Sequence, residues 1–359
     1  MSVRRLPKAA LGLAAAAPAL TLPILLGPYW TNLLNDVGIY AILGLSLNII
    51  LGHCGLFHMG HSAFYAVGAY TAAILSTRFG WPILWAMPFS GLLAALFALA
   101  VAKPIIHLRG DYLLVVTIGI VEIVRIALVN NIFGLTGGSN GLLIVDPIRI
   151  FGLDLFRPIH FYYLIWSMAA ITVVLFYLLQ NSRFGRALNY IKQDELAAEG
   201  SGIDTTRYKL AAFVLGALWA GMIGAIFAAK IETVSPQSFA YSESVLCFAI
   251  VILGGAGSIP GVLLGAFLIT GLPEVFRGLQ SYRLFFFGAA MVVMMIFRPQ
   301  GLIPPRRRRY DVRPYLGRFP CGIAAHYAVH AVQGDADGGM GPPGDGEREE
   351  YSLKKREES

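Results

Sequence analysis

The chain has 359 residues, of which 56% are hydrophobic and only 14% charged. Because soluble domains carry about 25% charged residues, this composition excludes an ordinary soluble protein and indicates a membrane protein. The net charge of +7 does not indicate nucleic-acid binding, since the basic residues lie between apolar runs, where they orient helices. The three cysteines are too scattered for a disulfide framework or a zinc site, and no metal site is predicted.

The chain begins with a basic head that is followed by the apolar run 9–27. This pattern fits either a cleaved signal peptide or a first membrane span. The run of about 19 residues is close to the length that a spanning helix needs, so we interpret it as a retained span.

The apolar runs predict an all-α fold, a polytopic membrane bundle of about 8 to 10 spanning or half-spanning helices. The runs are continuously apolar rather than alternating, which excludes the strands of a membrane barrel. Small residues at spacing four, namely Gly216, Ala220 and Gly224, would let helix backbones approach closely. The candidate spans are residues 9–27, 33–51, 61–78, 82–104, 111–130, 159–180, 208–229, 244–271 and 281–297.

Lys and Arg concentrate near the N-terminus, after the fourth span, between residues 183 and 209, and at residues 298–309. Cytoplasmic loops are enriched in these residues, so all four places, including both ends of the membrane domain, are predicted to be cytoplasmic. If residues 183–209 and 298–309 are both cytoplasmic, the chain between them crosses the membrane an even number of times. The spans 208–229 and 281–297 supply two crossings, so 244–271 must enter the membrane and return to the same side. Gly254, Gly255 and Gly257 interrupt this segment, which predicts two half-helices or a re-entrant hairpin.

A second glycine-rich interruption lies at residues 51–64, between the second and third spans. Glycine-interrupted segments in both halves of a transporter point to the substrate path. The three histidines of this interruption lack acidic companions, which favours helix-end or interfacial positions over a metal site; they are His53, His58 and His61. The candidate path residues at the two interruptions are Asn48, Gly52, Gly55, Gly60, Gly254, Gly255 and Gly257.

Glu122 and Arg125 are charged residues inside the span 111–130. They are three residues apart and therefore share a helix face. Charges within a membrane are costly and usually face the bundle interior or water. Two interpretations stay open: an ion pair that locks helices together, and a polar group in the translocation path.

The charged segment 183–207, between the spans 159–180 and 208–229, is predicted to contain a short helix from about residue 185 to residue 199. Leu188 and Ile191 lie about one turn apart and could face a partner or the membrane interface. Gly200 and Gly202 follow a run of good helix formers, as a helix end requires. Physical considerations alone favour an ordinary cytoplasmic loop helix.

"DELAAEGSGID" within this segment resembles the EAA-type cytoplasmic loop of bacterial ATP-binding cassette (ABC) importer permeases. "SRFGRALNYIKQDELAAEGSGIDTTRYKLAAFVLGA" is similar to the permeases of branched-chain amino acid importers. So are "GLSLNIILGHCGLFHMGHSAFYAVGAYTAAIL", "RGDYLLVVTIGIVEIVRIALVNNIFGLTGGSNGL" and "SPQSFAYSESVLCFAIVILGGAGSIPGVLLGAFL". The motifs run in family order over residues 35–305.

The resemblance implies that residues 183–207, here called the coupling segment, dock on an ATP-hydrolysing subunit. Its matching glutamates would meet polar or basic partner groups, its alanines would permit close approach, and Gly202 would end the helix. The resemblance implies that the glycine-rich external loop touches a solute-binding protein. Two glutamates that bracket another external loop could contribute to this contact or could be solvated charges at its rim. The implied coupling residues are Arg186, Glu195, Ala197, Ala198, Glu199 and Gly202, and the implied binding-protein contacts are Gly137, Gly138, Glu232 and Glu243.

The resemblance also implies a set of partners: a second permease subunit, two ABC ATPase subunits and a periplasmic solute-binding protein, in the inner membrane of a bacterium. No nucleophile–base pair or nucleotide motif occurs in the chain, so we expect no enzyme activity and no cofactor on this chain. ATP and Mg²⁺ would belong to the ATPase subunits. The permease domain is predicted to span residues 1–305. Residues 306–359 consist of a basic run and a Gly-, Pro- and charge-rich cytoplasmic tail. The tail, from Asp311 on, has no family counterpart and is predicted to be disordered.

Three other functions fit parts of the sequence. The same architecture could carry urea, short amides or another small solute, because substrate choice in such importers lies largely with the binding protein. A stand-alone channel or ion-coupled carrier would need no coupling segment. A membrane enzyme would have to use the histidines, which lack a convergent acid or base.

Overall fold

A computed structural model describes residues 8–108, 110–131, 134–144, 149–150, 153–154 and 158–271, with single positions and short stretches between 274 and 304. These residues belong to one compact unit, Met1–Arg306. Most of the predicted span 281–297, and the whole tail 306–359, lie outside the described residues.

The first helix, α1 (Lys8–Asn48), contains the first predicted span and most of the second. Gly27 adopts φ +78° inside it, a left-handed conformation that glycine takes without strain, and the helix kinks there. α1 then continues into the π-helical turn η1 (Ile49–His53), whose residues are all buried. π-helical turns are rare and occur often at functional sites.

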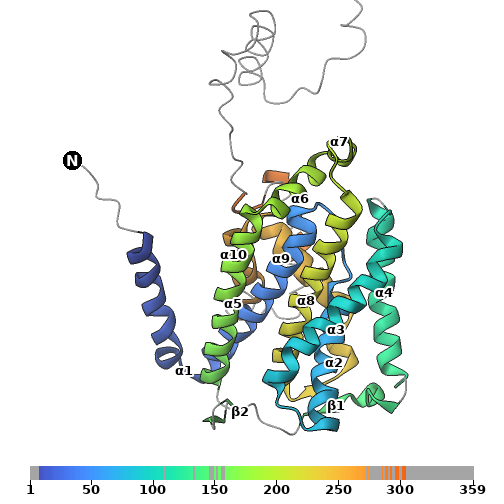
Figure 1. The fold of residues 1–359 in the computed structure, drawn as a ribbon. Coiled ribbons are helices and arrows are strands. Elements are labelled where there is room, and N and C mark those ends of the chain that lie inside the picture. Colours follow the sequence, from blue (N-terminus) through green and yellow to red (C-terminus); the bar gives the residue numbers. More distant parts are fainter. Residues whose placement is uncertain are drawn as a thin grey trace, which may run out of the picture. The chain divides into compact units, whose positions relative to one another are not determined.

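Three helices, α2 (His61–Phe79), α3 (Ile83–Ile105) and α8 (Thr205–Ile231), pack closely against one another (Figure 1). A Cβ atom on Gly68 of α2 would lie 2.3 Å from the backbone of Gly221 on α8. Such a contact requires glycine, because only glycine lets two helix backbones approach this closely. Gly216, Ala220 and Gly224 of α8 are buried, in keeping with their predicted role in packing.

The segment 244–271 lies in two helices, α9 (Tyr241–Gly254) and α10 (Ile259–Ala266), and the π-helical turn η5 (Phe267–Gly271). α10 folds back along α9, since a Cβ atom on Gly261 would lie 2.3 Å from the Gly254 carbonyl oxygen. Both helices pack against α1. The chain reverses at Gly255 and Gly257, which have φ of +117° and +96°. Four glycines therefore produce the hairpin.

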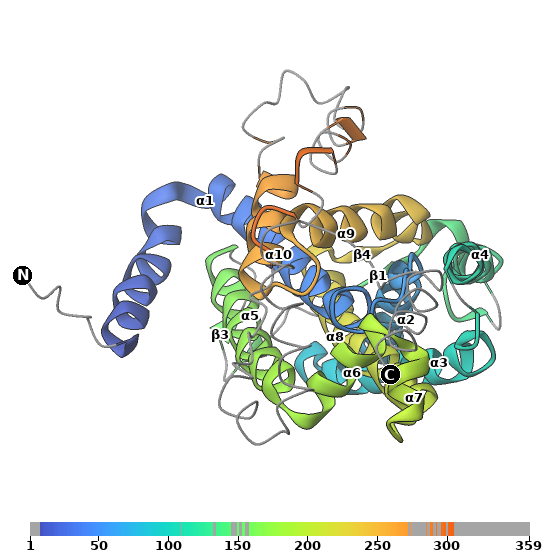
Figure 2. The ribbon, with the colours of Figure 1, turned by 90° about the horizontal axis from the view of Figure 1, so that it is seen from above.

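The remaining helices lie around this core. α4 (Asp111–Val129) is at the edge of the bundle in both views, and α5 (Pro158–Asn181) packs against α1 (Figures 1 and 2). The short helices α6 (Arg183–Gln193) and α7 (Glu195–Gly200) lie at one end of the bundle, at the top of Figure 1.

Short strands and 3₁₀ turns lie at the opposite end. β1 (Leu142–Leu143) pairs with β4 (Thr233–Val234), and β2 (Arg149–Ile150) with β3 (Leu153–Asp154), both antiparallel. The 3₁₀ turns are η3 (Gly138–Asn140) and η4 (Pro236–Phe239).

Six helices in the described part of the chain are long and apolar enough to cross a membrane. The prediction of an all-α, polytopic membrane bundle is confirmed. α2, predicted as a span, is a helix of 19 residues with more polar side chains and is not among the six. The six segments are Gly27–His53, Ile83–Ile105, Asp111–Val129, Pro158–Asn181, Thr205–Ile231 and Pro236–Gly254.

Candidate functional site

The coupling segment forms two helices, where the sequence suggested one from 185 to 199. Asp194 separates them in an extended conformation, with φ −154° and ψ 112°. Its carboxylate accepts a hydrogen bond from the Ala197 N–H at 3.1 Å and so caps α7. The prediction of a single helix was wrong because a capping aspartate inside a helix-forming run favours a new start.

The inner face of α6 packs into the bundle. Leu188 and Ile191 are 1% and 4% exposed and belong to the hydrophobic core. Their predicted outward orientation, toward a partner or the membrane interface, was therefore wrong. α6 contacts α5, α8 and η1, so it is fixed to the core along its length.

The two glutamates of α7 bond within the chain, where the family resemblance implied contacts to a partner. Glu195 forms an ion pair with the Lys209 ammonium of α8, and the Lys209 side chain is only 5% exposed. Glu199 accepts a hydrogen bond from the Thr205 hydroxyl at 2.6 Å. Both contacts fasten α7 to the first turns of α8, and Ala198 is buried beneath them.

The outer face of the coupling segment is exposed and partly apolar. Tyr190 is 56% exposed and Leu196 is 67% exposed. Arg186 and Ala197 are exposed as well. Gly202, with φ +82°, follows the end of α7. This rigid face, with two large apolar side chains, can bind another protein.

Lys192 of α6 joins the coupling segment to the π-helical turn η1. Its ammonium group donates a hydrogen bond to the Gly52 carbonyl oxygen at 2.7 Å. Gly55, with φ +77°, lies directly beneath the Lys192 stem, since a Cβ atom there would lie 2.9 Å from Lys192 Cγ. Gly52 and Gly55, two of the three predicted path glycines at this break, therefore contact the coupling segment.

The two glycine-rich interruptions meet at the same place. The Asn48 side-chain oxygen accepts a hydrogen bond from the Gly257 N–H at 2.8 Å. A Cβ atom on Gly52 would lie 2.5 Å from the same Gly257 nitrogen. We call the group of Asn48, Gly52, Lys192 and Gly257 the junction. It connects α6, the end of α1 and the α9–α10 turn.

The α9–α10 turn also binds residues near the end of the described chain. The Ile303 N–H donates to the Gly254 carbonyl oxygen at 3.1 Å, and the Leu302 N–H donates to the Leu253 carbonyl oxygen at 3.0 Å. Gly255 lies against Gly301, where a Cβ atom would lie 2.4 Å from the Gly255 Cα. The turn is therefore held on both sides by backbone contacts.

Gly60 lies apart from the junction, beside α4. A Cβ atom there would lie 2.7 Å from the His58 ring and 3.0 Å from the Thr117 carbonyl oxygen. His53 is the last residue of η1 and His61 the first residue of α2, so these two histidines lie at helix ends as predicted. All three rings are buried, because His53, His58 and His61 are 6%, 2% and 1% exposed. The His58 ring stacks on Phe64, and His61 Nε2 lies 2.7 Å from the Ser46 hydroxyl.

Glu122 and Arg125 of α4 form an ion pair, with Arg125 Nη2 and Glu122 Oε2 2.7 Å apart. The two side chains are 38% and 32% exposed. Within the described part of this chain the observed pair joins two residues of α4 itself, and both alternatives stay open.

At the end opposite α7, three of the four implied binding-protein contacts lie on neighbouring elements. Gly137 and Gly138, with φ of +70° and +63°, lead into β1. Glu232 precedes β4, and its carbonyl oxygen accepts from the Ile144 N–H at 2.7 Å. β1 pairs with β4, which brings the glycine-rich loop next to Glu232.

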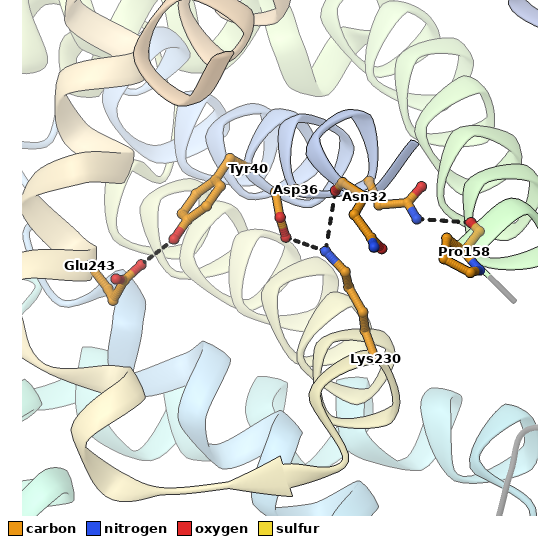
Figure 3. A network of polar contacts seen from close by, with 7 residues as sticks. Asn32, Asp36, Tyr40, Pro158, Lys230 and Glu243 are labelled. Carbon is orange, nitrogen blue, oxygen red and sulfur yellow. Dashed lines mark hydrogen bonds and ion pairs between the residues drawn. The ribbon is translucent and has the colours of Figure 1, made fainter. Parts of the chain in front are cut away.

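Glu243, the fourth implied contact, instead points into the bundle. Its carboxylate accepts a hydrogen bond from the Tyr40 hydroxyl at 2.7 Å (Figure 3). One turn earlier on α1, Asp36 forms an ion pair with Lys230 at the end of α8. Figure 3 shows these contacts as one polar network that joins α1, α8 and α9. Asn35 adds a bond to the Pro158 carbonyl oxygen of α5 at 3.0 Å.

Residues 29–295 match the family model described as "Branched-chain amino acid transport system / permease component". The chain belongs to this family. It is 38% identical over 299 residues to the high-affinity branched-chain amino acid transport system permease protein LivM of Salmonella typhimurium LT2, and equally to that of Escherichia coli K12. These alignments cover 77% of this chain and 70% of each relative.

A more distant relative is the permease protein LivH of Escherichia coli K12, which is 23% identical over 289 residues, 74% of this chain and 91% of the relative. No solved structure matches the chain. With its apolar helices, the permease is a multi-pass membrane protein.

Sequence reasoning did not identify several residues that organise this permease. Lys192 was only one of several charges in the coupling segment, and nothing in its spacing indicated a bond to Gly52. Leu196 was not among the implied coupling residues, although a leucine among charged residues is a signal for a contact surface. Tyr190 carries the same signal.

Proposed function

We propose that this permease is the membrane-spanning subunit of an ABC importer that translocates branched-chain amino acids across the bacterial inner membrane. Its partners are a second permease subunit, two ABC ATPase subunits and a periplasmic solute-binding protein. ATP and Mg²⁺ bind to the ATPase subunits, so this chain provides a path and carries out no chemical step. The N-terminus, the coupling segment and the C-terminus face the cytoplasm, as the distribution of Lys and Arg favours.

The observation that supports the proposal best is the rigid attachment of an exposed helix pair to the core. An ATPase that closes on nucleotide moves whatever is bound to it, and only a rigid element transmits that movement. α6 is fixed through Leu188 and Ile191, and α7 through the Lys209–Glu195 pair. Tyr190 and Leu196 stay outside as the contact surface for the ATPase subunit.

The junction gives this movement a route into the membrane domain. A displacement of α6 acts on η1 through the bond between Lys192 and Gly52, and on the α9–α10 turn through Asn48 and Gly257. Both η1 and the α9–α10 turn interrupt helices. Their irregular backbone can change conformation more easily than the backbone of a continuous helix. A stand-alone channel or carrier would have no use for this arrangement.

The test is purification of the permease with the ATPase subunits and the solute-binding protein encoded beside its gene. Leu196→Glu places a charge on the proposed ATPase contact, and we expect it to abolish co-purification of the ATPase subunits. The matched control is Leu143→Glu, because Leu143 in β1 is 62% exposed at the opposite end of the bundle. This variant should retain the ATPase subunits. Retention of both ATPase subunits by Leu196→Glu would refute the proposed contact surface.

A further inference from the structure

α4 differs from the other helices in how little of it is covered. It buries the smallest share of its apolar stretch among the six membrane-length helices, and it lies at the edge of the bundle in Figures 1 and 2. Its buried residues are Leu113, Thr117 and Val121, at a spacing of four. These residues form one narrow inner face, so most of the helix surface is left for another contact.

The outer face of α4 carries a stripe with the spacing of a helix–helix seam. Val115, Gly119, Glu122 and Ile126 follow one another at intervals of four, three and four residues. This spacing keeps side chains facing a second helix over several turns. Val115 is 64% exposed and Ile126 is 51% exposed, so the seam is open in this chain.

The Glu122–Arg125 ion pair lies on this side of α4, about 16 Å from the start of the helix at 1.5 Å per residue. That position is near the middle of a hydrocarbon core about 30 Å thick. About a third of each side chain remains exposed. Charged groups in membrane segments are costly in contact with lipid and almost always face protein or water. Lipid is therefore a poor neighbour for this face.

Gly119 supplies the space that a second helix needs. No atom lies within 4 Å of a Cβ atom built on Gly119, so this position faces open space one turn from Glu122. Small residues at such positions let membrane helices approach closely, and polar side chains beside them form hydrogen bonds across the interface. The open space at Gly119, the helix–helix spacing of the stripe and the Glu122–Arg125 ion pair thus lie together on one face of α4.

We propose that the outer face of α4 is the surface on which the second permease subunit packs. A membrane helix of that subunit lies along Val115, Gly119, Glu122 and Ile126 and adds a polar group to the ion pair. The inference rests on the proposed pairing of two permeases and adds the location of their contact. The similarity of this chain to both LivM and LivH supports a partner of the same fold.

The photo-crosslinking residue p-benzoylphenylalanine, placed at Val115 or Ile126, tests the contact in the complete importer. Matched control positions are Ile171 and Val174 on α5, which are 57% exposed each. We expect crosslinks to the second permease from the α4 positions and none from the α5 positions. Crosslinks from α5 alone, or none at all while the two permeases co-purify, would overturn the α4 interface but leave the pairing intact. Two permeases that never co-purify would overturn both.

Gly119→Leu provides a second readout, because it fills the proposed groove with a bulky apolar group. We expect co-purification of the second permease to fall at least about tenfold, which corresponds to ~1.4 kcal/mol of association free energy. Ala170→Leu, at an exposed position of α5, is the control and should have no effect. The amount of each variant in the membrane reports folding separately. Full co-purification with well-inserted Gly119→Leu would count against the proposal.

Discussion

The Lys192 ammonium donates a hydrogen bond to the Gly52 carbonyl oxygen at 2.7 Å, and this bond joins the coupling segment to a π-helical turn inside the bundle. A carbonyl in a regular α-helix is already used by the helix itself. Gly52 is the next-to-last residue of η1, where no following turn uses its carbonyl, so it can accept a hydrogen bond from the Lys192 side chain.

Replacing Lys192 by Met should uncouple ATP hydrolysis from transport. A hydrogen bond to a charged group contributes about 1.5–3 kcal/mol, and the partial exposure of Lys192 places it at the lower end. We expect uptake to fall about tenfold, since ~1.4 kcal/mol corresponds to a factor of ten. The ATPase subunits should remain bound. The measurement is uptake and ATP hydrolysis in proteoliposomes.

The control for this variant is Lys103→Met, at an exposed position near the end of α3. It removes the same charge without touching η1. If the two variants reduced uptake equally, the effect would come from lost charge and the bond to Gly52 would have no special role.

Removing Glu195 should destabilise the coupling segment strongly. Loss of one partner of a buried ion pair costs about 3–5 kcal/mol, and Lys209 is only 5% exposed. We expect Glu195→Leu to lower the thermal melting temperature of the purified permease clearly. The double variant Glu195→Leu with Lys209→Met should recover most of that loss, because no unpaired charge is left buried. Equal melting temperatures of the single and double variants would rule out a buried charge as the cause.

Gly254→Ala should push the helices α9 and α10 apart and so destabilise the hairpin that they form. A Cβ atom there would lie 2.3 Å from the Gly261 carbonyl oxygen, and overpacking of this kind costs about 1–3 kcal/mol. Gly200→Ala is the control, since no atom lies within 4 Å of its Cβ position. We expect the first variant to melt at a lower temperature and the second at an equal or higher one. A melting temperature unchanged by Gly254→Ala would show that the hairpin can open there without loss.

Lys230→Glu should disrupt the polar network at the other end of the bundle. It would place a second carboxylate beside Asp36, and like charges repel. The charge-reversed double variant Asp36→Lys with Lys230→Glu should restore the pair. Because Asp36 is 44% exposed, the Asp36–Lys230 ion pair contributes only about 1 kcal/mol or less to the stability of the fold. Melting temperatures of the single and double variants provide the comparison, and identical values would show that the network does not hold the helices together.

The helices were predictable because membrane spans depend on long apolar runs, and glycine marks their breaks. The break at Gly254–Gly257 was inferred from charge parity and glycine content, and α9 and α10 are observed there. The meeting of Asn48 with Gly257 could not be inferred, because the two residues are 209 positions apart and their contact depends on tertiary packing.

The functional residues were harder to predict than the fold. Sequence similarity to a family indicates which segment acts, but it does not show which way a side chain points. Glu195 and Glu199 were expected to meet polar or basic groups of a partner; Glu195 is paired with Lys209, and Glu199, although exposed, accepts a hydrogen bond from Thr205. A lysine at the start of the next helix could have suggested the Glu195 pair. The exposure of the Leu196 side chain depends on the orientation that α7 takes after Asp194, and the sequence does not reveal that orientation.

The side of the membrane on which the coupling segment lies is the most direct test of the account. Gln193→Cys, in a variant whose Cys54, Cys247 and Cys321 are replaced by alanine, would be treated with a membrane-impermeant maleimide. The account predicts labelling in inverted membrane vesicles and none in intact spheroplasts, with the reverse result for Leu143→Cys. Labelling of Gln193→Cys in intact spheroplasts would contradict the account, because no cytoplasmic ATPase could then reach the coupling segment.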